Sequence, residues 1–354
     1  GASGVGKTKI LRSIELLKDI ANGKDAKNAR WVLNFAIGDD LYRWEGEFER
    51  KKRSLLEALA FIDKDEDYLN HKVVFEKIIQ NDIEIIVRQE TALVFKGIES
   101  PVPIKAEQSV LALIPDPIIQ KIVKEFDKIL YSDCASSAFG AEGIEDPNIK
   151  LLPKYKTLES IRNSDEPLSD KLFWVYKKSK KTFNRIKDDF ISIFTQIKDL
   201  KFESLEELKK STAPIYWKTV QLFLFTEYGM NGFLHISDMS AGMQRALMHI
   251  MELHLSPDGT VILIDEFENS LGVNCIDELT TEIKAAMHRI QFIITSHHPY
   301  IINNIGYNNW KIVTRDGGKV FAQDASEFNF HKSKHEAFIQ LINLPAYKTG
   351  KHQL

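Results

Sequence analysis

The first eight residues of the chain have the types and spacing of a phosphate-binding loop. They match the complete Walker A pattern and read Gly1-Ala2-Ser3-Gly4-Val5-Gly6-Lys7-Thr8. In such a loop the backbone amides and the N-terminus of the following helix face a phosphate, because both carry partial positive charge. Lys7 would reach the β- and γ-phosphates of a nucleoside triphosphate, and Thr8 would offer its hydroxyl to Mg²⁺. A chance glycine-rich turn is the alternative, but the helical spacing of apolar residues from Ile10 onward disfavours it.

A phosphate-binding loop is the turn that joins a strand to a helix. No residues remain before Gly1 to form that strand. Because the motif works only in this context, we expect the natural chain to continue before Gly1. A protein that begins here is the alternative.

Two adjacent acids follow a short apolar run later in the chain. The run Val261–Ile264 reads as a strand of a buried parallel sheet, and Asp265 and Glu266 come directly after it. Asp265 is expected to hold Mg²⁺, directly or through water, and Glu266 to orient and polarise an attacking water molecule. A solvated strand end is the alternative, and the phosphate-binding loop makes the catalytic pair the preferred interpretation.

A third segment has the composition of a helix N-terminus that could bind an anion. It reads Met239-Ser240-Ala241-Gly242-Met243-Gln244-Arg245. Ser240 is a good N-cap residue, and apolar residues continue at helical spacing to Ile250. Ser240, the Gly242 amide and the helix dipole suit a phosphate. The alternative is an ordinary capped core helix.

A pair of histidines follows the next apolar strand, which we expect over Phe292–Thr295. The segment reads Thr295-Ser296-His297-His298-Pro299-Tyr300. A metal site is disfavoured because the side chains of neighbours on a strand diverge and no third ligand is evident. Two polar residues at a strand end are the plain alternative.

The order of these four motifs resembles the ABC-type P-loop ATPases. The chain is more similar to the structural-maintenance-of-chromosomes (SMC), RecF and OLD-type ATPases than to the transporter ATPases. Antiparallel hairpins follow soon after the first motif, and Glu268-Asn269 stands where transporters usually have Pro-Thr. Within this group the chain is similar to compact ATPases of bacterial anti-phage defence, such as the PARIS and Septu ATPases.

The resemblance implies an α/β fold, in which an ABC-type P-loop ATPase head carries an antiparallel β-subdomain and a helical lobe. It also implies that the helix N-terminus at Ser240 in one protomer binds the γ-phosphate held by the other. His297 would be the γ-phosphate sensor, but His298 occupies the usual serine position, so the choice between the two histidines stays open. Gln108 is the candidate for the glutamine loop. Ser270-Leu271-Gly272 lies at the D-loop position without the common ABC sequence.

These interpretations give one set of expected site residues. The expected catalytic residues are Lys7, Glu266 and His297. The expected Mg²⁺ ligands are Thr8, Asp265 and Gln108. The expected ATP contacts are Gly1, Ser3, Gly4, Val5, Gly6, Lys7, Thr8, Ser240, Gly242 and Gln244.

We expect these residues to be positioned by a single domain over residues 1–354 with three parts. Residues 1–114 hold the first motif, a helix and an antiparallel sheet, with hairpin strands at 31–37 and 42–48 and a second pair at 73–79 and 83–95. Residues 115–235 form a mainly helical insertion lobe. Its helical pattern runs from Pro115 to about Lys210, with an apolar stripe from Phe183 to Ile197, and a strand is expected at 220–225. Residues 236–354 hold the other motifs and the C-terminal part.

Composition limits the class of protein and its partners. The chain has 354 residues, is 44% hydrophobic and 27% charged, and carries a net charge of −3. It has two cysteines and no apolar run of membrane-spanning length, so a cytoplasmic protein without disulfides is expected. A basic segment runs from Lys177 to Lys187, which a solvated helix face or a nucleic-acid backbone would explain.

Three functions stay open on this evidence. The first is an ATPase that dimerises on ATP and controls an effector in phage defence, with the nuclease on a separate chain because neither a TOPRIM-like nor an HNH pattern is visible here. The second is a RecF- or SMC-like repair ATPase that binds DNA. The third is a nucleotide-gated scaffold that scarcely turns ATP over. A C-terminal stretch over Lys332–Lys351 could dock a partner or pack on its own lobe.

Overall fold

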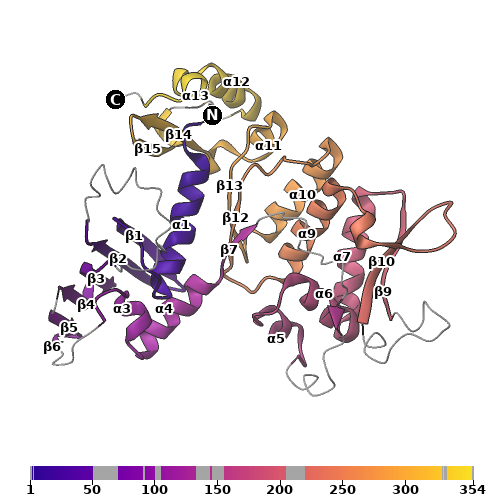
Figure 1. Cartoon of the computed structure of the whole chain (residues 1–354). Coiled ribbons are helices and arrows are strands. Elements are labelled where there is room, and N and C mark those ends of the chain that lie inside the picture. The colour runs from indigo at the N-terminus through magenta and orange to yellow at the C-terminus, as the bar shows by residue number, and fades with distance from the viewer. Residues whose placement is uncertain are drawn as a thin grey trace, which may run out of the picture. The chain divides into compact units, whose positions relative to one another are not determined.

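The computed structural model describes residues 2, 4–50, 71–90, 92–99, 105–132, 144–145, 155–204, 220–328, 330 and 333–352. The chain divides into two compact units (Figure 1). One comprises Arg12–Leu130, and the other comprises Gly1–Leu11 together with Tyr131–Leu354. The division falls within helix α1 (Lys7–Ala21).

The Arg12–Leu130 unit is built on a six-stranded antiparallel meander. The strands follow one another in the order β1 (Arg30–Ile37), β2 (Asp40–Phe48), β3 (Val73–Gln80), β4 (Ile83–Gln89), β5 (Ala92–Phe95) and β6 (Ile98–Glu99). The register of β1 and β2 sets Phe35 opposite Tyr42, so the predicted first hairpin is confirmed.

The prediction of one strand over 83–95 is wrong. The chain turns back after Gln89, and β4 and β5 pair as a hairpin with Gln89 opposite Ala92. Glu90 lies in the turn with φ +42°. This turn has none of the usual glycine, proline or asparagine signals, so the apolar alternation read as continuous.

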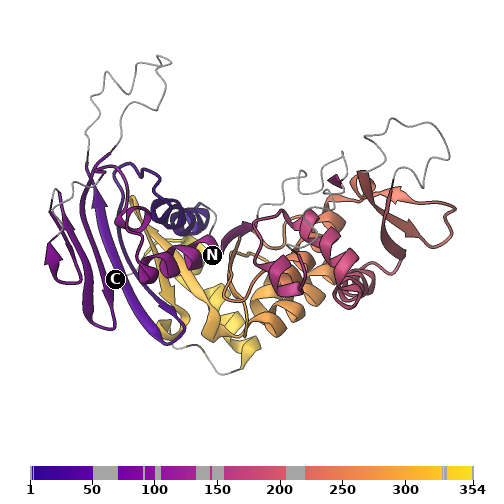
Figure 2. The ribbon, with the colours of Figure 1, turned by 90° about the horizontal axis from the view of Figure 1, so that it is seen from below.

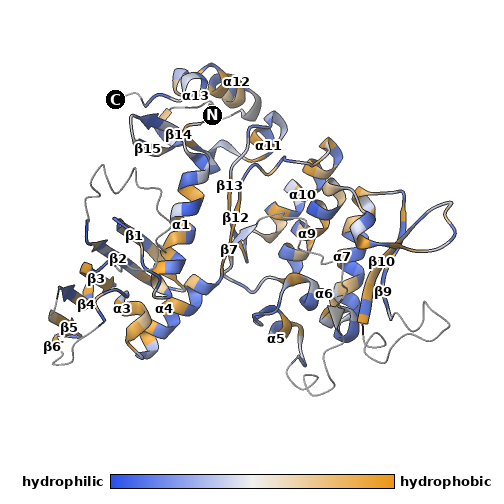
Figure 3. Cartoon of the chain, in the orientation of Figure 1, coloured by the Kyte–Doolittle hydropathy of each residue, from blue (hydrophilic) through white to orange (hydrophobic). Residues whose placement is uncertain are grey.

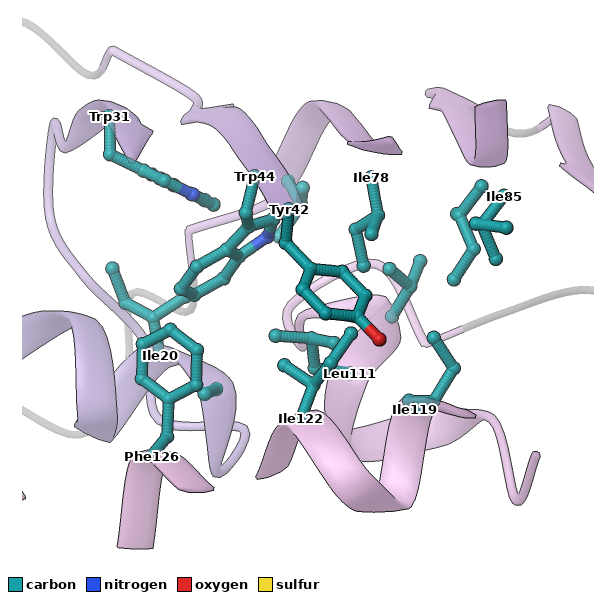
Figure 4. Close-up of a cluster of buried hydrophobic side chains, with 14 of the residues drawn as sticks. Ile20, Trp31, Tyr42, Trp44, Ile78, Ile85, Leu111, Ile119, Ile122 and Phe126 are labelled. Carbon is teal, nitrogen blue, oxygen red and sulfur yellow. The ribbon is translucent and has the colours of Figure 1, made fainter. Parts of the chain in front are cut away.

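The core of this unit lies between the sheet and helices on one of its faces (Figure 2). The helices that cover it are the later part of α1, α3 (Val110–Leu113) and α4 (Pro117–Asp127). Trp31 and Trp44 meet edge to face at 5.2 Å, and Phe126 of α4 contacts Trp44 at 5.3 Å (Figure 4). Trp44 and Ile122 are almost fully buried, so aromatic packing stabilises this unit.

The other unit contains a small sheet that carries the acidic motif. Its strands lie in the order β13 (Gln291–Ile294), β12 (Val261–Ile264) and β7 (Ile129–Ser132). β12 and β13 are parallel, and Leu263 and Ile264 are buried. The predicted buried parallel strand before Asp265 is therefore confirmed.

A helical lobe with its own antiparallel sheet precedes and surrounds the signature helix. The helices are α5 (Leu158–Arg162), α6 (Leu168–Lys178), α7 (Lys180–Ile193), α9 (Ala241–Leu255) and α10 (Val273–Ala286). β10 (Val220–Glu227), which is hydrophobic along most of its length in Figure 3, pairs with β8 (Ile144–Glu145), β9 (Ile197–Ser204) and β11 (Leu234–His235). The predicted strand at 220–225 is confirmed.

The predicted helical stripe from Phe183 to Ile197 extends too far. α7 ends at Ile193, and Ile197 begins strand β9. Ile197 is buried like the helical residues before it, but Leu200 and Phe202 continue the burial as strand positions paired with β10. The helical spacing reaches Ile197 only by coincidence, and pairing with β10 makes this residue part of a strand.

The C-terminal part packs on its own unit. It contains α11 (Pro299–Asn304), the hairpin β14 (Lys311–Asp316) and β15 (Lys319–Asp324), α12 (Lys334–Asn343) and α13 (Pro345–Thr349). α13 packs beside β14, and Leu341 and Ala346 are buried. This favours packing within the unit over a free docking tail for the Lys332–Lys351 stretch.

Candidate nucleotide-binding site

The phosphate-binding loop adopts the backbone that its glycines allow. Gly4 and Gly6 have φ +75° and +106°, and α1 begins at Lys7. Such positive φ values favour glycine, so the loop can turn its amides toward one point. Gly1 and Ser3, two of the expected ATP contacts, lie outside the described residues.

Lys7 lies among carboxylates at the start of α1. Its Nζ donates a hydrogen bond to the carbonyl of Ala2 at 3.2 Å. Burial lowers the pKa of Lys7, and the charges of Glu266, Asp265 and Glu268 oppose that shift in this order. A bound phosphate would give this partly buried ammonium group a compact negative partner in addition to these carboxylates.

The loop is held from behind by the C-terminal part of the chain. A Cβ on Gly350 would lie 2.2 Å from Val5 Cγ1, and a Cβ on Gly6 would lie 2.7 Å from Val320 Cγ2. Arg315 Nη1 also approaches the Gly4 carbonyl oxygen at 3.4 Å. Val5 is buried, so it anchors the loop and does not offer its side chain to a nucleotide.

Asp265 joins the loop to the parallel sheet. Thr8 Oγ1 donates to Asp265 Oδ2 at 2.6 Å, and Thr295 Oγ1 donates to Asp265 Oδ1 at 2.5 Å. Thr8 comes from α1, Asp265 follows β12 and Thr295 follows β13. The structure therefore brings together two residues that the sequence analysis assigned to one magnesium site.

These oxygens fit Mg²⁺. A hydroxyl and a carboxylate are hard ligands, and a P-loop magnesium site adds phosphate oxygens and water to them. Within the described residues, no group of three or more His, Cys, Asp or Glu side chains could hold a metal ion without such additional ligands. The Thr8–Asp265 pair is thus suited to a nucleotide-bound magnesium ion.

Glu266 has a strained backbone that two other residues support. Its φ of +47° is unusual for a residue other than glycine. Thr295 Oγ1 accepts a hydrogen bond from the Glu266 amide at 2.8 Å, and Arg245 Nη2 donates to the Glu266 carbonyl at 3.1 Å. The Glu266 side chain is exposed, so it remains accessible to water. Strain of this kind often marks a functional residue.

The structure distinguishes the two histidines of the switch segment. His298 is the N-cap of α11, and its Nδ1 accepts a hydrogen bond from the Tyr300 amide at 3.3 Å. His297 donates its backbone N–H to Glu268 Oε1 at 2.6 Å, and within the described residues no hydrogen bond is recorded for its ring. Because the ring of His298 has a structural role, His297 is the better candidate for a phosphate sensor.

The signature segment starts α9 as expected. Ser240 is its N-cap, and Ser240 Oγ accepts a hydrogen bond from the Met243 amide at 3.3 Å. The Gln244 side chain turns back to the Met239 carbonyl at 3.1 Å, so it braces the turn before the helix. Ser240 is exposed and can therefore meet a ligand from outside this chain.

Gly242 is crowded by its own chain. A Cβ there would lie 2.5 Å from the Ser270 carbonyl oxygen, which belongs to the expected D-loop position. Glycine at this position therefore has a packing reason as well as the proposed role toward phosphate.

Gln108 lies in the Arg12–Leu130 unit. Arg88 Nη1 donates to the Gln108 carbonyl at 2.7 Å. The side-chain amide nitrogen of Gln108 would lie 3.3 Å from a Cβ on Gly23. These contacts explain how the segment is held. The assignment of Gln108 as a Mg²⁺ ligand stays a prediction.

Several residues that shape the site could not be predicted from the sequence. They are Thr295, Arg245, Glu268, Arg315 and Gly350. Thr295 and Arg245 stand inside the motifs, but no local spacing shows which oxygen their side chains reach. Glu268 was only noted for its difference from transporters. Arg315 and Gly350 belong to no motif, so only the folded chain shows that they lie against the loop.

Residues 1–303 match the AAA_21 family, described as "AAA domain, putative AbiEii toxin, Type IV TA system". No curated protein matches the chain.

Heads of SMC proteins are among the solved structures that are similar to this chain. One is an SMC head bound to the C-winged helix domain of ScpA, at 13% identity and a TM-score of 0.44, covering 93% of this chain and 90% of that one. Another is the Pyrococcus furiosus SMC head bound to the C-terminal domain of ScpA, at 15% identity and a TM-score of 0.41, with the same coverages of 93% and 90%. A third is the Thermotoga maritima SMC head, at 11% identity and a TM-score of 0.30, covering 80% and 74%.

Within the described residues, no helix is both long enough and apolar enough to cross a bilayer.

The family match covers most of the chain and includes all four motifs. The chain therefore belongs to the AAA_21 family of AAA domains and has the α/β fold of a P-loop ATPase.

Proposed function

We propose that this chain binds and hydrolyses ATP, and that two copies close head to head around the nucleotide to control a partner effector. The observation that carries the proposal is the hydrogen-bonded set around Asp265. It joins Thr8 of the phosphate-binding loop to the end of β12 and, through Thr295, to the switch segment. A merely structural strand end has no need for this convergence on a Walker A threonine.

In the proposed reaction the phosphate-binding loop and Lys7 hold the triphosphate. Thr8 and Asp265 would hold Mg²⁺, which when bound neutralises phosphate charge. Glu266 orients a water molecule for in-line attack on the γ-phosphorus, and its exposed carboxylate accepts the water proton. His297 senses the γ-phosphate. The terminal P–O bond breaks, and ADP and phosphate leave.

Dimer formation follows from the exposed signature turn. Ser240 is exposed at the N-terminus of α9, where the helix amides carry partial positive charge. In a head-to-head dimer they would cap the γ-phosphate held by the other protomer. ATP then contacts both protomers whereas ADP lacks the bridging group, so the nucleotide biases the dimer equilibrium.

The effector part of the proposal is supported by the family alone. Its description names a toxin of a type IV toxin–antitoxin system, which favours a regulatory or defence role. A nuclease on a separate chain is the effector we propose.

Replacing Glu266 by Gln tests hydrolysis and dimer formation together. We expect this variant to hydrolyse ATP at least ~100-fold more slowly, because a neutral amide cannot accept the proton. It should also accumulate as an ATP-bound dimer by light scattering. Glu278→Gln, an exposed position on α10, is the matched control. A monomeric Glu266→Gln protein at saturating ATP, or unchanged turnover, would count against the proposal.

A DNA-stimulated ATPase is the second candidate. Lys177, Lys178, Lys180, Lys181 and Arg185 are all exposed, and no ion pair is recorded for any of them in the described parts of the chain. Such a basic cluster attracts a phosphate backbone. If this candidate is right, duplex DNA raises the ATPase rate of the wild-type protein but not of a variant with Lys180 and Lys181 changed to Glu. A rate unaffected by DNA favours the effector role.

A further inference from the structure

Glu268 is a carboxylate beside the proposed catalytic acids that the mechanism above does not use. It lies in the turn after β12, two residues beyond Glu266. Its Oε1 accepts the backbone N–H of His297 at 2.6 Å. Its Oε2 is buried, and no partner for it is found among the described residues. A buried oxygen without a hydrogen-bond partner lowers the stability of the folded chain. Its presence here therefore indicates a functional role for Glu268.

The surroundings of Glu268 connect three parts of the site. Burial lowers the pKa of Lys7 in the phosphate-binding loop, and the negative charge of Glu268 partly opposes that shift. It also acts on Tyr347 of α13, whose pKa is raised chiefly by burial and secondly by Glu268. Through His297 it holds the switch segment.

Hydrogen bonds in both directions attach the switch segment to the turn after β12, and in the middle the Phe267 amide donates to the Thr295 carbonyl at 3.1 Å. Thr295 Oγ1 accepts the Glu266 amide at one end, and Glu268 accepts the His297 amide at the other. Because the accepting and donating groups alternate between the two segments, neither segment can shift along the other without breaking a bond. The catalytic acid and the sensor histidine are thereby fixed to one another.

We propose that Glu268 is a positioning residue that holds the backbone of His297, and so sets the place of the sensor relative to Glu266. This inference rests on the proposed function for its catalytic consequence. The positioning itself is a property of the chain and can be measured without turnover.

Hydrogen exchange at the His297 amide tests the positioning directly. In Glu268→Ala the amide loses its acceptor, and we expect its exchange in the full chain to become at least ~10-fold faster. Glu278→Ala, which changes an exposed glutamate of α10, should leave that exchange unchanged. Unchanged exchange in Glu268→Ala overturns the proposal, whatever the enzyme's activity.

Steady-state kinetics test the consequence. Glu268→Ala should lower kcat by about tenfold with little change in the KM for ATP, because a sensor displaced by a fraction of an ångström no longer acts in the transition state. Glu268→Gln should restore most of kcat, since its amide oxygen can accept the same N–H.

The double variant Glu268→Ala/His297→Ala should be no slower than His297→Ala. Both changes remove the same function, which is the action of the sensor histidine. Additive losses, or no rescue by Glu268→Gln, would overturn the proposal. If the wild-type chain shows no ATP turnover while Glu268→Ala still accelerates exchange at His297, the proposed ATPase function fails and the positioning role stands.

Discussion

Thr295 links the two acids that follow β12. Its hydroxyl donates to Asp265 and accepts from the amide of Glu266, at 2.5 and 2.8 Å. It therefore orients the carboxylate expected to hold Mg²⁺ and supports the strained backbone of the expected catalytic acid. Its side chain is nearly buried, so water is a poor substitute for either bond.

Replacing Thr295 tests this role without changing the shape of the side chain. Thr295→Val keeps the volume but removes both hydrogen bonds, and we expect kcat to fall by ~10- to 100-fold. Thr295→Ser keeps the hydroxyl and should retain most of the activity. ATPase assays on both variants measure the difference, and equal rates for Val and Ser would contradict the role of the hydroxyl.

Local patterns in the sequence locate some of these residues but not their contacts. The motifs mark Thr8 and Asp265, and the folded chain brings their oxygens within 2.6 Å. They do not show that Arg245 reaches the carbonyls of Asp265 and Glu266, because that contact depends on how α9 packs beside β12. Side-chain contacts between distant segments have no local signature.

Among the elements, the C-terminal hairpin and α13 support the phosphate-binding loop. Gly350 has φ +67° at the end of α13, and Arg315 pairs with it by donating its backbone N–H to the Gly350 carbonyl at 2.7 Å. Val5 packs against this glycine. The loop that would bind phosphate is thus held by residues more than three hundred positions away in the sequence.

A pair of glycine substitutions separates packing from backbone strain. Gly350→Ala places a methyl group against Val5, and we expect weaker ATP binding and a lower melting temperature. Gly317→Ala is the control, because Gly317 has φ +52° in the β14–β15 turn but open space around it. Similar ATP affinities for the two variants would contradict the bracing role of Gly350.

In the Arg12–Leu130 unit, a buried carboxylate fixes the segment that carries Gln108. Glu76 accepts hydrogen bonds from Trp44 Nε1, Ser109 Oγ and the Val110 amide, at 2.9, 2.5 and 2.8 Å. Arg88, opposite it on β4, donates to the carbonyls of Lys105, Ala106 and Gln108.

Removing that carboxylate leaves three donors without their acceptor and takes away the negative charge that acts on Arg88. We expect Glu76→Ala to lower the free energy of unfolding by about 3 kcal/mol, because buried donors that lose their acceptor are left unsatisfied. Gln89→Ala, an exposed change on β4, is the control. Urea unfolding measures both, and a loss below about 1 kcal/mol for Glu76→Ala would contradict the anchoring role.

Elements with strong periodic patterns could be predicted, and those that depend on pairing could not. The hairpin at 31–48 and the buried strand 261–264 have clear alternation or continuous apolar character. Strand β9 follows directly on a helix of matching spacing, so its identity depends on pairing with β10.

At the scale of the whole molecule, each chain carries all the parts of an ATP site. Under the proposed mechanism one copy cannot bring its own Ser240 onto its own nucleotide, so two copies are needed. The phosphate-binding loop and the acids lie together, whereas Ser240 is exposed and caps only its own helix. Ser240 is a better position for testing closure than Gly242, because a side chain at Gly242 would collide with the Ser270 carbonyl of the same chain.

The most direct measurement of the central claim is the ATPase rate of a mixture of two inactive variants. Lys7→Ala removes the lysine that holds the triphosphate, and Ser240→Arg blocks the capping turn. In a mixed dimer, the intact loop of the Ser240→Arg protomer faces the intact Ser240 of its partner, so one complete site forms. The account predicts that each variant alone is inactive and that mixing restores up to about one quarter of the wild-type rate, because half of the dimers are mixed and each has one site. A mixture as inactive as its components, with both variants folded and able to dimerise, would contradict it.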